Sequence, residues 1–236
     1  MKGTREENAG EEARKRYSII YADPPWAYLW GTGKDGGHFA PEKHYPTMTT
    51  EEICALKVRE LRAPNCVLAL WTTSPCLPDA FEVLKAWGFK YKTVLFVWLK
   101  LNPAAGTIVC GPGSYTRSAC EYVLLGMRGH IKRVSKKPIS QVLEAPRGMH
   151  SAKPAMVRDL LVELFGDLPR VELFARQKVA GWDAFGNEVD SSIPIPACDV
   201  SSDAVSPRSA YIEFDRVSKI KKPALPCPLK RRERPM

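Results

Sequence analysis

The chain has 236 residues, of which 44% are hydrophobic and 26% are charged. This length and composition are enough for one substantial core and do not demand a second globular domain. Lysine and arginine outnumber aspartate and glutamate by 35 to 26, which gives a formal charge of +9. Such an excess favours a polyanionic partner, nucleic acid first, through long-range attraction and counterion release, although charge alone does not choose the partner.

Several kinds of site and location are disfavoured by the sequence. The seven cysteines are irregularly spaced and form no CxxC pair or Cys/His zinc pattern, so we expect reduced thiols and no metal site. His38 and His44 also lack the spacing of zinc ligands. The first 16 residues contain no apolar run typical of a signal peptide, and no stretch approaches the length of a membrane span. A cytoplasmic protein without membrane contact is therefore expected.

The two ends of the chain differ in composition from its middle. Residues 1–16 are charged and poor in apolar side chains, which predicts a flexible arm outside the core. Residues 191–236 are rich in serine, proline and basic side chains, and from Ser201 onward nine lysines and arginines face four acids. Such a basic tail suits non-specific phosphate contact or simply keeps the protein in solution. The folded domain is expected over residues 17–190.

Within this domain, short apolar runs alternate with helical patterns. The candidate strands, in chain order, are residues 17–22, 66–72, 92–100, 121–129 and 170–176. Apolar side chains at three- and four-residue spacing predict helices over residues 79–87 and 153–166, with Gly88 and Gly166 as their C-terminal stops. This alternation predicts an α/β fold with a mostly parallel sheet that is covered by helices on both faces.

The tetrapeptide Asp23-Pro24-Pro25-Trp26 follows the first candidate strand directly, where open α/β sheets place their ligands. A carboxylate at Asp23 and the Pro24 carbonyl can accept the two hydrogens of an exocyclic amine and so free its delocalised lone pair. Trp26, with Tyr28 beyond it, offers a flat face for an extruded base. The alternative is an ordinary turn with Trp26 in the core, which explains the prolines but not the acid and the aromatic together.

The same residues carry a family resemblance. YADPPW and HYPTMT resemble the adenine methyltransferase family that includes the catalytic subunit of the messenger-RNA adenine methylation complex and many bacterial and phage DNA-modifying enzymes. The likeness continues in order through LALWTT, AWGFKYKTVLFVWLK, TRSACEYVLLGMRG, HSAKP and PRVELFARQKVAGWDAFGNE, over roughly residues 17–190. It implies a Rossmann-like methyltransferase fold in permuted order, with the catalytic strand before the cofactor strand, in a bacterial or phage-infected cell.

The resemblance also implies a set of ligand-binding residues. S-adenosylmethionine, which leaves S-adenosylhomocysteine as product, is the implied cofactor. The residues that match the family's cofactor contacts are Glu172, Phe174, Arg176, Asn187 and Glu188, with Lys153 near the donor's carboxylate and Asp23 near its charged end. From the residues alone, a surface salt bridge would explain Glu172 and Arg176, and a turn would explain Asn187.

Nucleic-acid contacts are expected from basic loops. Residues 127–138 carry five cations and no acid, namely Arg128, Lys132, Arg133, Lys136 and Lys137. A phosphate-contacting loop and a merely solvated basic loop explain them equally well. Arg117, in a long glycine-rich loop that could close over substrate, is a further candidate for phosphate or base contact.

Three functions remain open at this point. The first is S-adenosylmethionine-dependent methylation of the N6 amine of adenine in DNA, and the second is the same chemistry on RNA. The third is a non-catalytic nucleic-acid-binding subunit that keeps the fold, against which the intact DPPW and cofactor blocks argue. The sequence leaves open whether the protein is a monomer or a homodimer, and it shows no readable target sequence.

Overall fold

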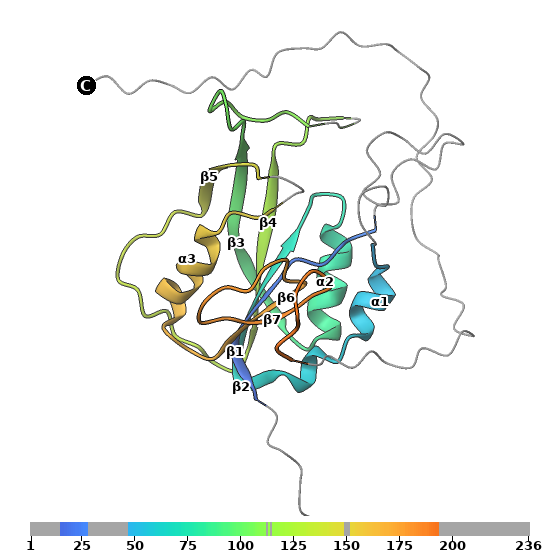
Figure 1. Ribbon diagram of the computed structural model, residues 1–236, viewed down its shortest axis with the longest axis vertical. Coiled ribbons are helices and arrows are strands. Elements are labelled where there is room, and N and C mark those ends of the chain that lie inside the picture. Colours follow the sequence, from blue (N-terminus) through green and yellow to red (C-terminus); the bar gives the residue numbers. More distant parts are fainter. Residues whose placement is uncertain (1–14, 28–46, 112, 114, 149–151, 194–236) are drawn as a thin grey trace, which may run out of the picture.

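The computed structural model describes residues 15–27, 47–111, 113, 115–148 and 152–193. In this part of the chain seven strands form one sheet, in the order β5-β3-β4-β2-β1-β6-β7 (Figure 1). The elements in chain order are β1 (Tyr17–Ala22), α1 (Thr50–Ala55), the 3-10 turn η2 (Val58–Glu60), β2 (Arg62–Thr72), α2 (Leu77–Ala86), β3 (Lys90–Leu101), β4 (Cys120–Arg128), β5 (Val142–Pro146), α3 (Met156–Phe165), β6 (Arg170–Leu173) and β7 (Asp183–Phe185).

The sheet is parallel except for one strand. β1 pairs in parallel with β2 and β6, β6 with β7, and β3 with β5. β4 lies between β2 and β3 and is antiparallel to both. The carboxyl ends of the parallel strands therefore meet at one edge of the sheet, and β4 brings its first residues to that edge. The predicted α/β fold with a mostly parallel sheet is confirmed.

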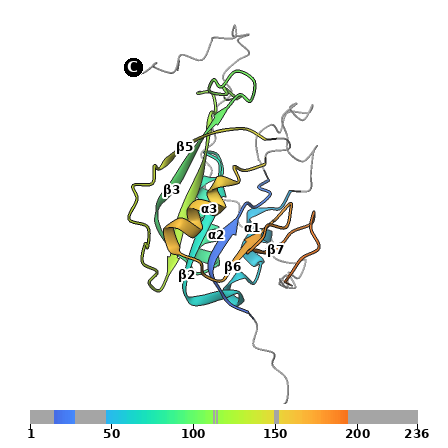
Figure 2. The same cartoon turned by 60° about the vertical axis from the view of Figure 1, so that its left-hand side comes forward.

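Helices cover both faces of the sheet. Side chains alternate between the two faces along each strand, so a continuously apolar strand presents an apolar surface on both sides. On β1, Ile20 points to the face covered by α1 and α2, where it joins Ile53 and Val83 in one core cluster. Its neighbour Ile19 points to the other face and packs with Leu161 of α3 in a second cluster. Figures 1 and 2 show α3 on one side of the sheet, with α1 and α2 on the other. The prediction of helices on both faces is also confirmed.

Four short elements were not predicted, namely α1, η2, β5 and β7. α1 begins with a capping box, in which Thr49 accepts from the Glu52 backbone and Glu52 accepts from the Thr49 backbone. This Thr-x-x-Glu pattern is a readable sequence signal for a helix start. β5 and β7, of five and three residues, are the two edge strands of the sheet. Strands this short carry too few apolar positions to be recognised by periodicity.

Two arginines hold the opposite edge of the sheet, at the amino-terminal ends of the parallel strands. Arg59 donates from Nε to the Ala86 carbonyl at 2.7 Å, and Arg62 donates from Nη1 to the Trp87 and Gly88 carbonyls at 2.9 and 2.5 Å. These carbonyls belong to the end of α2, which has no further turn to bond them. The two guanidinium groups therefore cap α2.

Candidate active site

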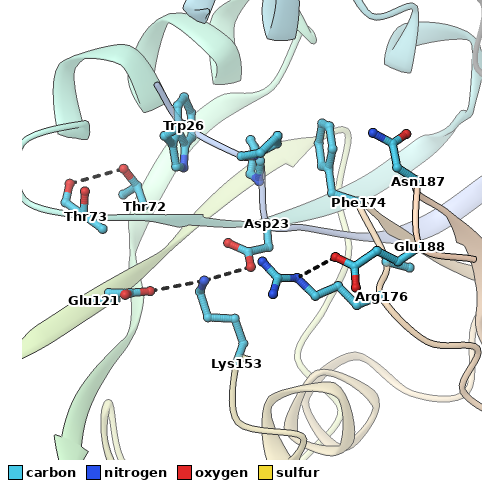
Figure 3. A pocket seen from close by; sticks show the side chains of 13 residues that line it. Asp23, Trp26, Thr72, Thr73, Glu121, Lys153, Phe174, Arg176, Asn187 and Glu188 are labelled. Carbon is cyan, nitrogen blue, oxygen red and sulfur yellow. Dashed lines mark hydrogen bonds and ion pairs between the residues drawn. The ribbon is translucent and has the colours of Figure 1, made fainter. Parts of the chain in front are cut away.

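A pocket opens at the carboxyl-terminal edge of the sheet, where the loops after β1, β2 and β6 meet (Figure 3). Its lining residues are Asp23, Pro24, Pro25, Trp26, Thr72, Thr73, Glu121, Lys153, Phe174, Ala175, Arg176, Asn187 and Glu188. In Figure 3, Asp23 lies between two groups of side chains, with Thr72 and Glu121 on one side and Arg176 and Asn187 on the other. The pocket thus unites most of the predicted catalytic and cofactor residues.

The DPPW loop is fixed by backbone hydrogen bonds. Trp26 N–H donates to the Pro24 carbonyl at 2.9 Å, which closes a tight turn. Met48 N–H donates to the Pro25 carbonyl at 2.8 Å, and Ala27 N–H donates to the Met48 carbonyl at 3.1 Å. Because a carbonyl oxygen has two lone pairs, Pro24 keeps an acceptor position beyond the one that its turn uses. The conformation of the loop therefore depends on the segment just before α1.

Trp26 has a larger structural role than the sequence predicted. Its ring is only 5% exposed and belongs to the core cluster under α1 and α2. Its indole N–H donates to the Trp71 carbonyl at 3.1 Å. Trp26 lines the pocket with only part of its ring, because the residue is largely buried, and stacking of a base on that ring stays a prediction. Trp26 also anchors the DPPW loop to the core.

Asp23 points into the pocket and is paired with Lys153. The distance from Lys153 Nζ to Asp23 Oδ2 is 2.8 Å, and both side chains are largely buried, with 13% and 22% of their surface exposed. Burial raises the pKa of Asp23 above its usual range, and Lys153 offsets only part of that effect. Burial also disfavours the charge on Lys153, but the attraction of Asp23 and Glu121 outweighs it and raises the pKa of Lys153. The pocket therefore holds a desolvated, ion-paired carboxylate.

Glu121 is a pocket residue that the sequence analysis did not single out. It is 7% exposed and lies near the start of β4. Its Oε2 is 3.4 Å from Lys153 Nζ, and its Oε1 is 2.5 Å from Lys100 Nζ. Burial opposes its charge, but the two lysines together lower the pKa of Glu121 below its usual range. An acid inside the apolar run CEYVLLG was the available signal, since buried carboxylates are rare unless paired.

The other side of the pocket is built by the loops after β6 and β7. Phe174 follows β6 with a left-handed φ of 61°, an unusual conformation for a residue other than glycine. Ala175 N–H donates to the Phe185 carbonyl at 2.9 Å. A Cβ on Gly186 would lie 2.1 Å from the Ala175 carbonyl oxygen, so only glycine allows the two loops to approach this closely. Arg176 follows directly, and its Nε lies 3.6 Å from Glu188 Oε1.

Glu172 is not part of this pocket, contrary to the expected cofactor contact. Its carboxylate receives two hydrogen bonds from Arg158 of α3, from Nε at 2.6 Å and from Nη2 at 3.0 Å. Glu172 lies on β6 beside Tyr21, whose ring packs on the α3 face of the sheet. Strand alternation therefore turns the carboxylate toward α3, where it forms a buried ion pair with Arg158.

The predicted nucleic-acid residues lie in several places. Arg117 donates to the carbonyls of Gly111 and Cys110 at 2.5 and 3.0 Å, so it stabilises its own loop. Arg128 ends the antiparallel strand β4 and is therefore at the far edge of the sheet from the pocket. Three exposed cations follow it, Lys132, Arg133 and Lys136, together with Lys137, whose Nζ is 3.3 Å from Glu163 Oε1. Tyr28 lies outside the described residues, as do His38, His44 and the basic tail.

The described residues contain neither a metal-binding cluster nor a membrane-spanning helix. No group of three or more histidine, cysteine, aspartate or glutamate side chains in these ranges could hold a metal ion. Among the described helices, none combines the length and the apolar character needed to cross a bilayer.

Comparison with known proteins identifies the family of this chain. The family model MT-A70 matches residues 17–188, which include every lining residue of the pocket. The chain belongs to the MT-A70 family. It is 37% identical over 199 residues to the type II methyltransferase M.MunI of a Mycoplasma species, an alignment that covers 78% of this chain and 82% of that relative. The resemblance drawn from the DPPW block is thereby confirmed.

More distant relatives match the same part of the chain. The N6-methyladenosine RNA methyltransferase MTA1 of Pyricularia oryzae is 29% identical, over 75% of this chain and 48% of its own length. The human N(6)-adenine-specific methyltransferase METTL4 is 26% identical, over 75% of this chain and 38% of its own length. This MT-A70 protein thus spans less than half of either relative. It is a methyltransferase, and its sheet has the expected Rossmann-like arrangement.

Proposed function

We propose that this MT-A70 protein transfers a methyl group from S-adenosylmethionine to the exocyclic N6 amine of adenine in DNA. The observation that carries the proposal is the position of Asp23, a desolvated carboxylate at the carboxyl end of β1. It lies in one pocket with the polar side chains of Arg176, Asn187 and Glu188. An acid that accepts hydrogen bonds and a donor-rich ligand pocket are the two parts this reaction needs.

The described residues fit the proposed cofactor. S-adenosylmethionine carries a carboxylate, an ammonium, a sulfonium, ribose hydroxyls and an adenine ring. The pocket offers Lys153 and Arg176 as cations, Glu188 and Asn187 as hydrogen-bonding groups and Phe174 as an apolar ring. A side chain at position 186 would collide with the Ala175 backbone, so glycine there keeps the two loops together at the rim. When bound, the cofactor would supply an electrophilic methyl group.

Asp23 and Pro24 would prepare the target nitrogen. The exocyclic amine of adenine is a poor nucleophile because its lone pair is delocalised into the ring. Lys153 is bonded to Asp23 Oδ2, and we assign Oδ1 to one amine hydrogen. The Pro24 carbonyl, fixed by the Trp26 turn, would accept the other. Two acceptors on the hydrogens favour tetrahedral geometry and release the lone pair, and the proton lost on methylation has Asp23 as its nearest base.

The choice of DNA over RNA depends on the comparisons, because charge does not distinguish the two polymers. The type II methyltransferase is the relative that matches with 37% identity over most of both chains, and we take its class as pointing to DNA. The formal charge of +9 suits either nucleic acid. RNA remains the alternative, because the fungal relative that is named as an RNA methyltransferase shares 29% identity with this chain.

Product analysis tests the proposal directly. Purified protein would be incubated with methyl-labelled S-adenosylmethionine and with DNA and RNA oligonucleotides of matched, varied sequence, followed by mass spectrometry of the nucleosides. We expect N6-methyladenine in DNA and at least tenfold less in RNA. Preferential methylation of RNA would favour the alternative, and labelled cytosine or no product on any polymer would reject the proposal.

Cofactor binding separates an enzyme from a non-catalytic subunit. We expect S-adenosylmethionine to bind measurably by calorimetry and Arg176→Ala to weaken that binding by roughly tenfold or more, since it removes a charged contact. Lys178→Ala is the matched control, because Lys178 pairs with Asp190 on the exposed surface. A protein that binds DNA but shows no cofactor binding would instead be the scaffold subunit.

A further inference from the structure

Four charged side chains form a continuous ion-pair network from the surface to the catalytic aspartate. In order they are Lys100, Glu121, Lys153 and Asp23, and their signs alternate. Successive charged atoms lie 2.5 Å apart for Lys100 and Glu121, 3.4 Å for Glu121 and Lys153, and 2.8 Å for Lys153 and Asp23. This ion-pair network connects β3 and β4 to the loop after β1, and Figure 3 shows its inner three residues.

Both lysines lie over indole rings. Lys153 Nζ is 5.6 Å from the centre of the Trp71 ring, and Lys100 Nζ is 5.4 Å from that of Trp98. The two rings contact each other edge to face at 6.0 Å. The Trp71 indole N–H donates to the Tyr21 hydroxyl at 2.7 Å, and that of Trp98 to the Ala145 carbonyl at 2.9 Å. This buried aromatic pair gives the two ammonium groups a rigid support.

Glu121 competes with Asp23 for the ammonium group of Lys153. An ammonium group between two carboxylates stabilises the negative charge of each one less than it would stabilise that of a single carboxylate. Asp23 is also faced by Arg176 after β6, which favours its charge, and by the buried Tyr21 hydroxyl of β1. Glu121 disfavours the charge of Asp23, both by direct repulsion and by holding Lys153. A carboxylate whose charge is less compensated is a stronger hydrogen-bond acceptor.

We propose that Glu121, held by Lys100, is a positioning residue that shares Lys153 with Asp23 and thereby keeps Asp23 a strong acceptor for the target amine. The proposal depends on the function proposed above. Neither Glu121 nor Lys100 has to touch the base for this role. Glu121 and Lys100 change the pKa of Asp23 in opposite directions. Glu121 raises it because it is an acid, and Lys100 lowers it because it compensates the charge of Glu121.

Two variants test these opposite signs. Glu121→Gln keeps the shape of the side chain but removes its charge, so Lys153 turns to Asp23 and the pKa of Asp23 falls. Lys100→Met removes the outer ammonium, so Glu121 draws Lys153 more strongly and the pKa of Asp23 rises. The measurement is a ¹³C NMR titration of the Asp23 carboxyl in the cofactor-free protein, with Asp23→Asn used to assign the signal. This readout does not depend on methyltransferase activity.

Activity provides the second arm. With DNA and cofactor saturating, we expect Glu121→Gln to lower the plateau of kcat by roughly tenfold, because a weaker acceptor activates the amine less. The acid limb of the pH profile should move to lower pH in Glu121→Gln and to higher pH in Lys100→Met. The matched control is Glu144→Gln, an exposed acid on the neighbouring edge strand β5, which should leave rate and pH profile unchanged.

The outcomes are distinguishable. If the wild type methylates no adenine, the proposed function fails, while the NMR titration still tests the electrostatic coupling. If the wild type is active but both variants shift the pKa of Asp23 in the same direction, or leave it unchanged, the coupling is wrong. If the pKa shifts as expected and kcat of Glu121→Gln equals that of the wild type, the positioning role is wrong. Should Glu121→Gln fail to fold, Lys100→Met still decides, because Lys100 is partly exposed.

Discussion

The two edges of the sheet use charged side chains in opposite ways. At the carboxyl-terminal edge, Asp23, Lys153 and Glu121 are buried and compensate one another around a pocket. At the amino-terminal edge, Arg59 and Arg62 donate hydrogen bonds to backbone carbonyls at the end of α2. Burying charges against each other costs desolvation that an apolar core would avoid, so it is weak evidence for stability. The charged side chains at one edge therefore suit chemistry, and those at the other edge support folding.

The largest effect is expected at Asp23. Asp23→Asn keeps the size of the side chain but replaces an anionic acceptor by a neutral amide, so we expect methyl transfer to fall by roughly a thousandfold or more. Single-turnover rates with preformed complex measure this loss. Asp190→Asn is the control, because Asp190 is an exposed acid paired with Lys178 outside the pocket. A loss below tenfold at Asp23 would show that the chemistry does not need this carboxylate.

The second largest effect is expected at the rim of the pocket, at Gly186. Gly186→Val places side-chain atoms against the Ala175 carbonyl, where even a Cβ would lie at 2.1 Å, so the loops after β6 and β7 must separate. We expect affinity for S-adenosylmethionine to fall by roughly tenfold to a hundredfold, because the proposed cofactor residues lie on these two loops. Calorimetry gives the dissociation constant. Gly106→Ala, at a glycine with open space around it but a left-handed φ of 62°, is the control for replacing a glycine without a collision. Equal affinities in wild type and Gly186→Val would place the cofactor elsewhere.

The opposite edge should affect stability and leave catalysis intact. Arg62→Ala removes the hydrogen bonds to the Trp87 and Gly88 carbonyls, and we expect a loss of about 2 kcal/mol in the free energy of unfolding. Urea unfolding measures the loss, while kcat at a temperature where the variant stays folded should match the wild type. Lys90→Ala, an exposed cation at the start of β3, is the control. A large fall in kcat without a change in stability would break the distinction between the edges.

The smallest effect is expected from the basic loop after β4. Lys132, Arg133 and Lys136 follow Arg128, which ends at the edge far from the pocket. Replacing all three by alanine should lower DNA affinity by less than about threefold at physiological salt, because contacts there would be long-range rather than direct. Fluorescence anisotropy over a range of salt concentrations measures it. A tenfold loss with a clearly reduced salt dependence would restore this loop as a direct phosphate contact.

Much of the fold could be predicted because the strands are continuous apolar runs. Residues 17–22 of the first candidate strand agree with β1, and the other four candidate strands overlap β2, β3, β4 and β6. The predicted strand over residues 170–176 runs past the end of β6, because Phe174 takes a left-handed backbone that no pattern of hydrophobicity encodes. β5 and β7 were missed because short edge strands depend on pairing partners far away in the sequence.

The candidate site could be predicted in part for a related reason. Asp23 directly follows β1 and Arg176 comes three residues after the end of β6, and a position near a strand end can be recognised in the sequence. Glu121 and Glu172 lie within strands, where the direction of the side chain depends on register and on the face that each neighbour covers. The sequence therefore missed the first, which lines the pocket, and expected in the pocket the second, which pairs with Arg158 instead of lining it.

The pH dependence of kcat/KM for S-adenosylmethionine tests the central claim most directly, because this constant reports ionisations of the free enzyme. Burial raises the pKa of Asp23, so the ionised acceptor is lost as pH falls through a value above the usual range of an aspartate, near 3.9. We predict that wild-type activity declines along an acid limb above that range, and that the residual activity of Asp23→Asn lacks this limb. An identical acid limb in both proteins would contradict the claim that the ionised Asp23 accepts the amine.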